Sequence, residues 1–351
     1  MADPLRVGLI GVGAVAMVHL EAYRGLSQVH VVAAADSNPQ RLAEVAGREG
    51  LRGYASAAQM LASESLDIVC VLTPTAAHEA AVLECARAGV HVLCEKPLSL
   101  SVESCERMIA ACQAHGVQLC YGASYRYLPA VAKARELILS GALGEILLLR
   151  ESAIGGNGPA GRGTLGPHHF PPGGPGGSGM GLIDHGIHLI DTFSWLMESP
   201  IRSATGRGNV SGAAQRPEYM VMEFENGAFG HLTYEDGTFA TELPGEGHFS
   251  WGGGWDVNGL TAPGGWQAHP GCIHVHGTLG ALRIFHYGNH LYRCDAQGMR
   301  QVAVPEGAMP GNFSRQLATF AEAIVAGQPA PVPGSVGLQA CRALLSIYPK
   351  V

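Results

Sequence analysis

The most unusual charged residues of the sequence follow directly on an apolar run. Glu95, Lys96 and Pro97 come straight after Val90–Cys94, a segment that is expected to form a buried strand. Ionised side chains are costly to bury unless they are paired or used. From position alone, Lys96 is either a surface lysine that pairs with Glu95 or a lysine that takes part in chemistry.

A second group combines a carboxylate with an imidazole. Asp184 and His188 are four residues apart within Leu182–Met197, which has helical spacing, so both side chains are expected on one face of a helix. An imidazole with a pKa near 6.5 suits general base catalysis at neutral pH. His185 is expected to face elsewhere and to be structural. Asp191 either supports His188 or caps a buried polar group.

A glycine-rich turn indicates a dinucleotide site. Gly11, Gly13 and Ala16 form the pattern G-x-G-x-x-A between an expected strand and an expected helix. Gly11 permits the tight turn, Gly13 lets a pyrophosphate approach the backbone, and the helix N-terminus faces the anion. Asp36 follows near the spacing of about 20 residues expected for the acid that binds the ribose. It favours NAD over NADP because it repels a 2′-phosphate; alternatively, it is a strand-end aspartate that caps the next helix.

Composition places the chain among globular proteins. Of its 351 residues, 47% are hydrophobic and 15% charged; the formal net charge is −7, and Lys and Arg do not cluster, so no nucleic acid is expected as a partner. No apolar run reaches the roughly 20 residues of a membrane helix, and the N-terminus lacks the pattern of a signal peptide. The nine scattered cysteines are typical of reduced thiols. We therefore expect a cytoplasmic protein without membrane association.

Short apolar runs alternate with helical patterns over the first ~120 residues, which predicts βαβ units on a parallel sheet. Beyond Ala123, strand-like pairs dominate, and Asn226-Gly227 is a strong hairpin signal. The predicted fold is α/β, with an N-terminal Rossmann dinucleotide-binding domain at 1–123 and a C-terminal α+β domain with a largely antiparallel open sheet at 124–351. Helices are expected at Ala14–Tyr23, Pro39–Glu49, Ala57–Ser63, Ala76–Ala88, Ser101–His115, Asn312–Ala326 and Val336–Ile347.

The ordered series of motifs resembles the Gfo/Idh/MocA oxidoreductases, the group of glucose–fructose oxidoreductase and inositol dehydrogenase. After the glycine-rich turn it includes TPTAAH at 73–78, CEKPLSLS at 94–101, SYRYLPA at 124–130, GALGEI at 141–146 and GLIDHGIHLIDTFSWL at 181–196. The resemblance implies an NAD-dependent enzyme that transfers hydride between nicotinamide and a secondary hydroxyl or ketone of a sugar, cyclitol or glycoside. It also implies a second domain that binds the substrate and makes oligomer contacts, and hence a homodimer or homotetramer.

The resemblance assigns roles to individual residues. Lys96 would hydrogen-bond the reacting oxygen beside the nicotinamide, with a pKa below its free value. His188 would accept the hydroxyl proton, and Asp184 would orient His188 or bind a neighbouring hydroxyl. Lys96, Asp184 and His188 are thus the expected catalytic residues, acting on one carbon. Expected to bind the cofactor are Gly11, Gly13, Ala14, Val15, Asp36, Ser37, Thr73, Pro74, Thr75, His78, Glu95, Lys96 and Arg126; expected to bind the substrate are Lys96, Tyr125, Tyr127, Asp184 and His188.

Two other classes of function remain open. An NAD-dependent glycosidase would oxidise and re-reduce its substrate within each cycle, and a sugar or nucleotide sensor would keep the fold without chemistry. A sensor would need neither Lys96 nor His188, so their joint presence disfavours it.

Two further features of the sequence have no assigned role. No metal is expected, because the sixteen histidines, including His168-His169 and His274-x-His276, show no zinc-ligand spacing. The stretch 155–179, rich in Gly and Pro, could fold over the site as a lid. Three tryptophans could stack on a sugar or pack in an interface or core: Trp251, Trp255 and Trp266.

Overall fold

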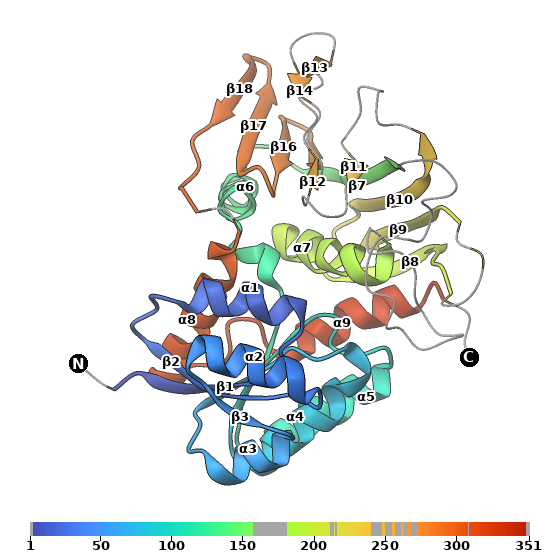
Figure 1. Cartoon of the computed structure of the whole chain (residues 1–351). Coiled ribbons are helices and arrows are strands. Elements are labelled where there is room, and N and C mark those ends of the chain that lie inside the picture. Colours follow the sequence, from blue (N-terminus) through green and yellow to red (C-terminus); the bar gives the residue numbers. More distant parts are fainter. Residues whose placement is uncertain are drawn as a thin grey trace. The chain divides into compact units, whose positions relative to one another are not determined.

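The structure, a computed structural model, describes residues 3–156, 181–210, 214, 216–239, 248–249, 255–256, 261–262, 266–267, 272–307 and 309–348. The chain divides into two compact units, coloured along the sequence in Figure 1. Unit 1 comprises Met1–Ser124 and Pro310–Cys341, and unit 2 comprises Tyr125–Met309 and Arg342–Val351. The division predicted from the sequence placed all of 124–351 in one domain, and did not assign Pro310–Cys341 to the first.

Unit 1 is built on a six-stranded parallel sheet of order β3-β2-β1-β4-β5-β6. The order reverses between β1 and β4, and ligands of open α/β sheets bind at such a point, beyond the carboxyl ends of the strands. The strands are apolar on both faces because helices cover both faces. The strands are β1 (Leu5–Ile10), β2 (Val29–Ala35), β3 (Arg52–Tyr54), β4 (Ile68–Val71), β5 (His91–Cys94) and β6 (Leu119–Tyr121).

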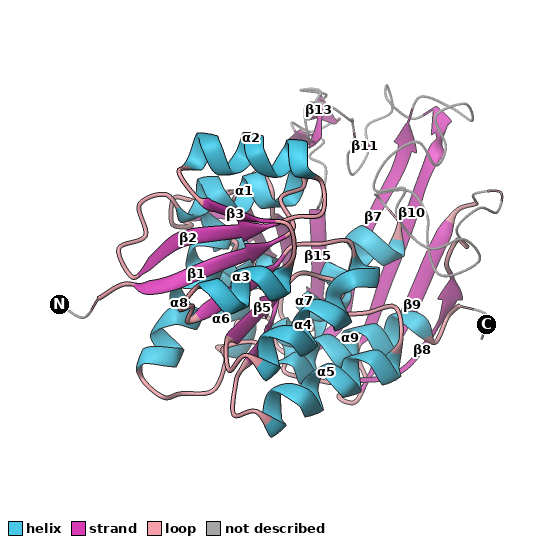
Figure 2. Ribbon diagram, turned by 60° about the horizontal axis from the view of Figure 1, so that its bottom comes forward, coloured by secondary structure: helices cyan, strands magenta, loops and turns pink. Residues whose placement is uncertain are grey.

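The helices of unit 1 form two layers around this sheet (Figure 2). α1 (Ala14–Tyr23) and α2 (Pro39–Glu49) lie on one face. They connect β1 to β2 and β2 to β3, and right-handed crossovers that move in the same direction along a sheet place their helices on the same face. α3 (Ala57–Ser63), α4 (His78–Arg87) and α5 (Val102–Ala114) lie on the other. Asn38, Ser56 and Ser101 begin α2, α3 and α5 with side-chain caps, which explains why these helices begin where they do.

Two helices from the end of the chain complete unit 1. These are α8 (Gly311–Val325) and α9 (Gly334–Leu345), of which residues up to Cys341 belong to the unit. The ring of Phe313 packs 4.6 Å from that of His19, and Ser314 donates a 2.5 Å hydrogen bond to the Ala22 carbonyl. The backbone nitrogen of Tyr121 in β6 donates to the carbonyl of Val332 at 2.8 Å.

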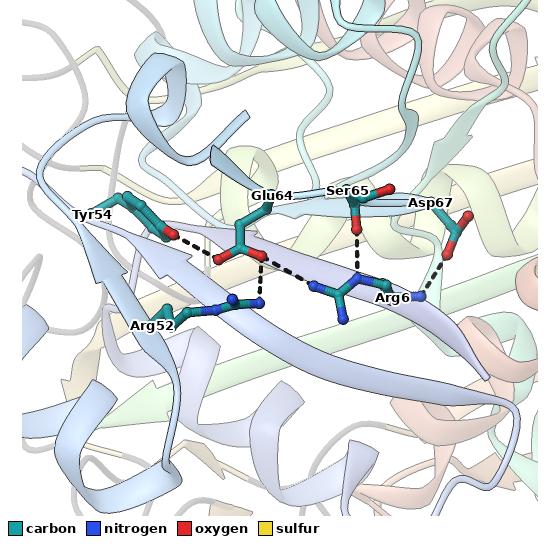
Figure 3. A network of polar contacts seen from close by, with 6 residues as sticks. All are labelled: Arg6, Arg52, Tyr54, Glu64, Ser65 and Asp67. Atoms are coloured by element: carbon teal, nitrogen blue, oxygen red, sulfur yellow. Dashed lines mark hydrogen bonds and ion pairs between the residues drawn. The ribbon is translucent and has the colours of Figure 1, made fainter. Parts of the chain in front are cut away.

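A buried carboxylate fixes the segment before β4 (Figure 3). Glu64 accepts hydrogen bonds from Tyr54 at 2.6 Å, Arg52 at 2.5 Å and Arg6 at 3.0 Å. Arg6 also binds two groups of residues 65–67 through its side chain and its backbone nitrogen. The carboxylate is 2% exposed, so its three partners replace the water that it loses on folding. This network joins Arg6 of β1 and Arg52 and Tyr54 of β3 to Glu64, in the segment before β4.

Unit 2 is built on an eight-stranded sheet of order β18-β17-β16-β15-β7-β10-β9-β8. All neighbours are antiparallel except β10 and β7, so the predicted fold class is confirmed. Gly227 has φ +88° in the turn between β9 and β10, as the hairpin signal predicts. The strands are β7 (Ile146–Gly156), β8 (Ile201–Arg207), β9 (Glu218–Phe224), β10 (Phe229–Phe239), β15 (Cys272–Gly277), β16 (Ala281–Phe285), β17 (His290–Asp295) and β18 (Gly298–Val302).

α6 (Pro129–Leu139) and α7 (Ile187–Met197) pack against each other and against this sheet (Figure 1). A π-helical turn, Leu182–Gly186, leads directly into α7. Short strands form two further pairs: β11 (His248–Phe249) with β12 (Trp255–Asp256), and β13 (Thr261–Ala262) with β14 (Trp266–Gln267).

Some predictions concern residues outside those described. These are most of the stretch 155–179, with His168 and His169, and Trp251; for Trp255 and Trp266 only the backbone is described. Among the described helices, none has the length and hydropathy that crossing a bilayer requires.

Candidate active site

The turn after β1 has the features that a dinucleotide requires. Gly11 has φ +91°, and a Cβ there would lie 3.0 Å from the main chain of Leu72, so only glycine fits. A Cβ at Gly13 would meet nothing within 4 Å, which leaves room for a ligand to approach the backbone. No side chain caps the start of α1, where Ala14 and Val15 present their backbone N–H groups. A pyrophosphate fits such an uncapped, positively polarised helix end.

Polar groups at the ends of β2 and β4 complete the fit. The carboxylate of Asp36 accepts 2.8 Å hydrogen bonds from the backbone nitrogens of Val12 and Asn38, which fix it at the end of β2. Ser37 beside it is exposed. Oγ1 of Thr73, after β4, is buried and has no hydrogen-bond partner among the described residues. A nucleotide hydroxyl or phosphate oxygen would satisfy this atom, so the residues of unit 1 fit a dinucleotide.

The loop after β5 is anchored by Glu95. The Lys96–Pro97 peptide bond is cis, and Lys96 is partly exposed. Glu95 is buried; Oε1 lies 2.9 Å from Nε2 of His19, and Oε2 accepts from the Lys96 backbone nitrogen at 3.0 Å. Burial, the largest single influence, works to raise the pKa of Glu95, but the hydrogen bonds and charges of His19 and Lys96 together outweigh it and hold the pKa below its usual value. The carboxylate expected to bind the cofactor is therefore engaged within unit 1, where it positions Lys96.

His78 braces the same loop. Its Nδ1 lies 3.1 Å from the carbonyl oxygen of Pro97 and 3.3 Å from that of Leu98, and its Nε2 lies 2.9 Å from that of Thr73. The ring is buried, and burial lowers its pKa despite the surrounding carbonyl groups. His78 therefore joins the end of β4 to the loop after β5. Its predicted contact with the cofactor stays a prediction, as do those of Pro74 and Thr75.

In unit 2, the π-helical turn presents Asp184 and the first turn of α7 presents His188. The turn is held by Glu218, a buried carboxylate that accepts from the backbone nitrogen of Leu182 at 2.9 Å. Asp184 and His188 are partly exposed, whereas the three residues between them are buried. This burial pattern fits the expectation that both side chains lie on one face. Single π-helical turns occur frequently at functional sites.

The imidazole of His188 is stacked on Tyr125. The two ring centroids are 4.0 Å apart with planes at 6°. The Tyr125 hydroxyl lies 3.3 Å from Nδ1 of His185 and contacts the hydroxyl of Tyr287. Burial raises the pKa of Tyr125 well above its usual value, so the phenol is neutral. The stacked phenol ring restricts the rotation of the His188 side chain. The contact of Tyr125 with the substrate rests on the family resemblance alone and stays a prediction.

Arg126 is engaged within unit 2. Its guanidinium donates to both carboxylate oxygens of Asp191, at 2.9 and 2.5 Å, and lies 5.5 Å from the ring centroid of Trp195. Asp191 is buried, so it pairs with Arg126 as a structural bridge. The predicted cofactor contact of Arg126 stays a prediction, and so does the substrate contact of Tyr127, which is partly exposed.

Sequence reasoning missed a buried polar cluster around Glu151 on β7. Nε2 of His185 and the hydroxyl of Tyr234 each lie 2.9 Å from its Oε2. Its Oε1 lies 3.7 Å from Nε2 of His286, which directly follows β16. Burial, the largest single influence, favours protonation of Glu151, but the contributions of His185, His286 and Tyr234 together outweigh it and lower the pKa; burial lowers the pKa of His286 to about 4. A glutamate among the apolar residues of β7 was the available signal.

Lys96 belongs to unit 1, and Asp184 and His188 belong to unit 2. Unit 1 brings the glycine turn, Asp36 and Thr73 to the carboxyl ends of its strands. Unit 2 brings His188 and Tyr125 into ring contact. The predicted convergence of Lys96 and His188 on one carbon stays a prediction.

Two protein-family models match this chain and define its class. Residues 5–123 match the family model described as an oxidoreductase family with an NAD-binding Rossmann fold. Residues 131–283 match the model of the GFO/IDH/MocA C-terminal domain. The chain thus belongs to the Gfo/Idh/MocA family of oxidoreductases, and the predictions of the family and of NAD as the cofactor are confirmed.

Relatives agree with this assignment, and a solved structure has the same fold. An inositol 2-dehydrogenase of Saccharopolyspora erythraea is 31% identical over 231 residues, which is 64% of either chain and thus just under two thirds of the relative's length. A D-glucoside 3-dehydrogenase of Escherichia coli is 30% identical over 67% of this chain and 68% of its own. An oxidoreductase from Agrobacterium radiobacter, solved with NAD+, L-tartaric acid and magnesium, has the same fold, with a TM-score of 0.76 at 20% identity over 99% of this chain and 96% of its own.

Proposed function

We propose that this protein is an NAD-dependent dehydrogenase that oxidises a secondary hydroxyl of a sugar, cyclitol or glycoside. The observation that carries the proposal is the presentation of His188 by α7, stacked on Tyr125 with ring centroids 4.0 Å apart. Asp184 lies four residues before it and is also partly exposed. Relatives of this chain are named inositol 2-dehydrogenase and D-glucoside 3-dehydrogenase, which supports a polyol or sugar as the substrate class.

The residues have complementary tasks in the proposed reaction. When bound, NAD supplies the nicotinamide ring that accepts a hydride. His188 removes the hydroxyl proton at a ring nitrogen, and Asp184 orients His188 or binds a neighbouring hydroxyl. The ammonium group of Lys96 donates a hydrogen bond to the same oxygen and stabilises the negative charge that develops on it. Glu95 positions Lys96 by accepting from its backbone nitrogen at 3.0 Å.

We also propose a cytoplasmic homodimer or homotetramer that binds neither nucleic acid nor membranes. The cysteines support a reducing compartment: eight of the nine are buried and all are free thiols. Neighbouring strands of the unit 2 sheet carry exposed apolar side chains, Leu147 on β7 and Phe229 on β10, each 49% exposed, and Tyr219 on β9. An apolar sheet face of this kind fits a contact between copies of the chain.

The test is a turnover assay with His188→Asn and Lys96→Ala. Wild-type protein is incubated with NAD+ and a panel of inositols, aldoses and methyl glycosides, and reduced nicotinamide is followed by absorbance. We expect turnover in the wild type and a loss of kcat of about 10²–10⁴-fold in each variant, because general acid–base catalysis contributes about this factor. NAD+ should still bind the His188→Asn protein. His231→Gln, on β10, is the matched control and should keep full activity.

Two outcomes would contradict the proposal: no turnover in a folded wild-type protein that binds NAD+, or full activity in His188→Asn. Release of nitrophenol from nitrophenyl glycosides without net formation of NADH would identify the glycosidase instead. Binding of NAD+ without either reaction would identify a sensor.

A further inference from the structure

Independently of the proposed reaction, we propose that unit 2 contains a binding site for one divalent transition-metal ion, formed by Glu151, His185 and His286. The three residues come from β7, from the π-helical turn and from the position after β16. They are far apart in the sequence, which is why the histidine spacings gave no indication of a metal. The inference concerns binding and does not depend on the dehydrogenase activity.

The donor atoms are close enough for one ion. Each residue offers one ligand atom, and these atoms lie within 4.8 Å of one another. Oε1 of Glu151 and Nε2 of His286 are 3.7 Å apart. Two ligands of a tetrahedral zinc ion, with bonds of about 2.0–2.1 Å, are separated by about 3.4 Å. Small rotations of the three side chains would therefore bring all of them into coordination.

The cluster contains donor atoms that the protein leaves unsatisfied. Oε1 of Glu151 and both ring nitrogens of His286 are buried without a hydrogen-bond partner among the described residues. Both side chains are 0% exposed, so water does not compensate either group at the surface. Buried polar atoms of this kind are rare in folded proteins because each costs free energy. A metal ion would satisfy the free oxygen and one nitrogen of His286 together, and it would neutralise the carboxylate.

The surroundings orient the donors as metal sites usually do. Nδ1 of His185 lies 3.3 Å from the Tyr125 hydroxyl, so Nε2 points to Glu151. The Tyr234 hydroxyl donates to Oε2 of Glu151 at 2.9 Å, which leaves Oε1 available. Outer contacts that hold a ligating imidazole and a ligating carboxylate are typical of metal centres. Tyr125 and Tyr234 therefore hold two of the three donor residues, His185 and Glu151, in place.

The donor set selects the kind of ion. Two imidazoles and one carboxylate suit Zn²⁺ and related ions such as Co²⁺, whereas Mg²⁺ and Ca²⁺ prefer sites made only of oxygen ligands. Three protein ligands leave a fourth position open to water or to a small molecule. We therefore commit to Zn²⁺, with Co²⁺ as its spectroscopic substitute.

The experiment measures metal bound to purified, tag-free protein of full length. The protein is stripped with a chelator, dialysed against micromolar ZnCl₂, and analysed for metal by mass spectrometry; CoCl₂ is titrated in parallel and visible absorption recorded. Glu151→Gln keeps an acceptor for Tyr234, and His286→Gln keeps a polar side chain. His231→Gln removes a histidine outside the cluster and serves as the matched control. NAD+ binding by unit 1 and thermal unfolding report whether each variant is folded.

We expect one Zn²⁺ per chain in the wild type and in His231→Gln, with the absorption bands of four- or five-coordinate Co²⁺. In Glu151→Gln and His286→Gln the affinity should fall by at least about 100-fold, since even outer contacts are worth 10–100-fold. The proposed site would be overturned if the wild-type protein bound no zinc. It would also be overturned if Glu151→Gln and His286→Gln bound zinc as tightly as the wild type. If His286→Gln does not fold, Glu151→Gln decides alone, because its hydrogen bond to Tyr234 is retained.

Discussion

Asp36 has a structural role in unit 1, and we propose that the same carboxylate recognises the ribose of NAD. It accepts backbone hydrogen bonds at 2.8 Å from Val12 in the glycine turn and from Asn38 before α2. The substitution Asp36→Asn keeps one acceptor oxygen but removes the negative charge. We expect the Kd for NAD+ to rise about tenfold, and the Kd for NADP+ to fall because a 2′-phosphate is no longer repelled; tenfold corresponds to about 1.4 kcal/mol. Calorimetric titration with each nucleotide measures both constants.

The exposed neighbour Ser37 offers the control for this prediction. Because Ser37→Ala removes no charge, it should leave the ratio of the Kd values for NAD+ and NADP+ within about twofold of the wild-type ratio. An unchanged preference in Asp36→Asn would show that another group discriminates between the nucleotides.

The backbone conformation of Gly11 and the position of Asp36 at a strand end were predictable because both follow from local rules. Gly11 needs a positive φ, and Asp36 ends a strand at a fixed distance from the glycine turn; both can be inferred from neighbouring residues. The cluster of Glu151, His185 and His286 could not be found in this way. It depends on the order of β7, β15 and β16 in a sheet and on the π-helical turn, none of which neighbouring residues determine.

At the scale of elements, His78 joins the end of β4 to the loop after β5, and it makes this junction sensitive to pH. Burial lowers the pKa of the folded-state imidazole, whereas in the unfolded chain the pKa is near 6.5. Below pH 6.5 the unfolded chain gains a proton that the folded protein does not, so the free energy of unfolding decreases as the pH falls. The loss is at most about 1.4 kcal/mol per pH unit, and it ends where the pH reaches the folded-state pKa.

His78→Gln should remove this contribution. Gln carries an amide donor but does not titrate, so the melting temperature of the variant should decrease less between pH 7.5 and pH 5.5 than that of the wild type. At pH 7.5 the variant itself should be less stable, by about 1–3 kcal/mol, because one buried partner of the carbonyl groups is altered. Calorimetric scans at both pH values provide the comparison. Parallel decreases in the two proteins would mean that His78 is protonated equally in both states.

Helices were more predictable than strands at this scale. α1, α2 and α3 have the bounds expected from their patterns, because caps and apolar spacing are local signals. β3, with three residues, and β8 were not predicted, since strands so short or so exposed carry little pattern. α6 was also missed, although Pro129 stands in its first turn, where proline favours a helix start. The parallel pairing of β10 with β7 joins distant segments and has no local signal.

At the scale of the whole molecule, the chain leaves unit 1 after Ser124 and returns to it at Pro310. The change in strand pattern after Ala123 placed the expected domain boundary between residues 123 and 124. The return could not be predicted, since α8 and α9 have amphipathic patterns that would fit either unit. Their place is decided by long-range packing: Phe313 on His19, and the backbone bond from Tyr121 to Val332.

This organisation predicts that residues 1–124 do not fold alone. Phe313, Leu317 and Phe320 of α8 are buried. Burying each side chain contributes about 1.5–3 kcal/mol, so the three together are comparable to the whole stability of a small domain. Nδ2 of Asn312 lies 3.5 Å from the Ser124 carbonyl, so a short Gly/Ser linker can join 1–124 to 310–341. We expect the joined protein to unfold cooperatively and to bind NAD+, and residues 1–124 alone to do neither. Cooperative unfolding and NAD+ binding by 1–124 alone would show that α8 and α9 are dispensable to unit 1.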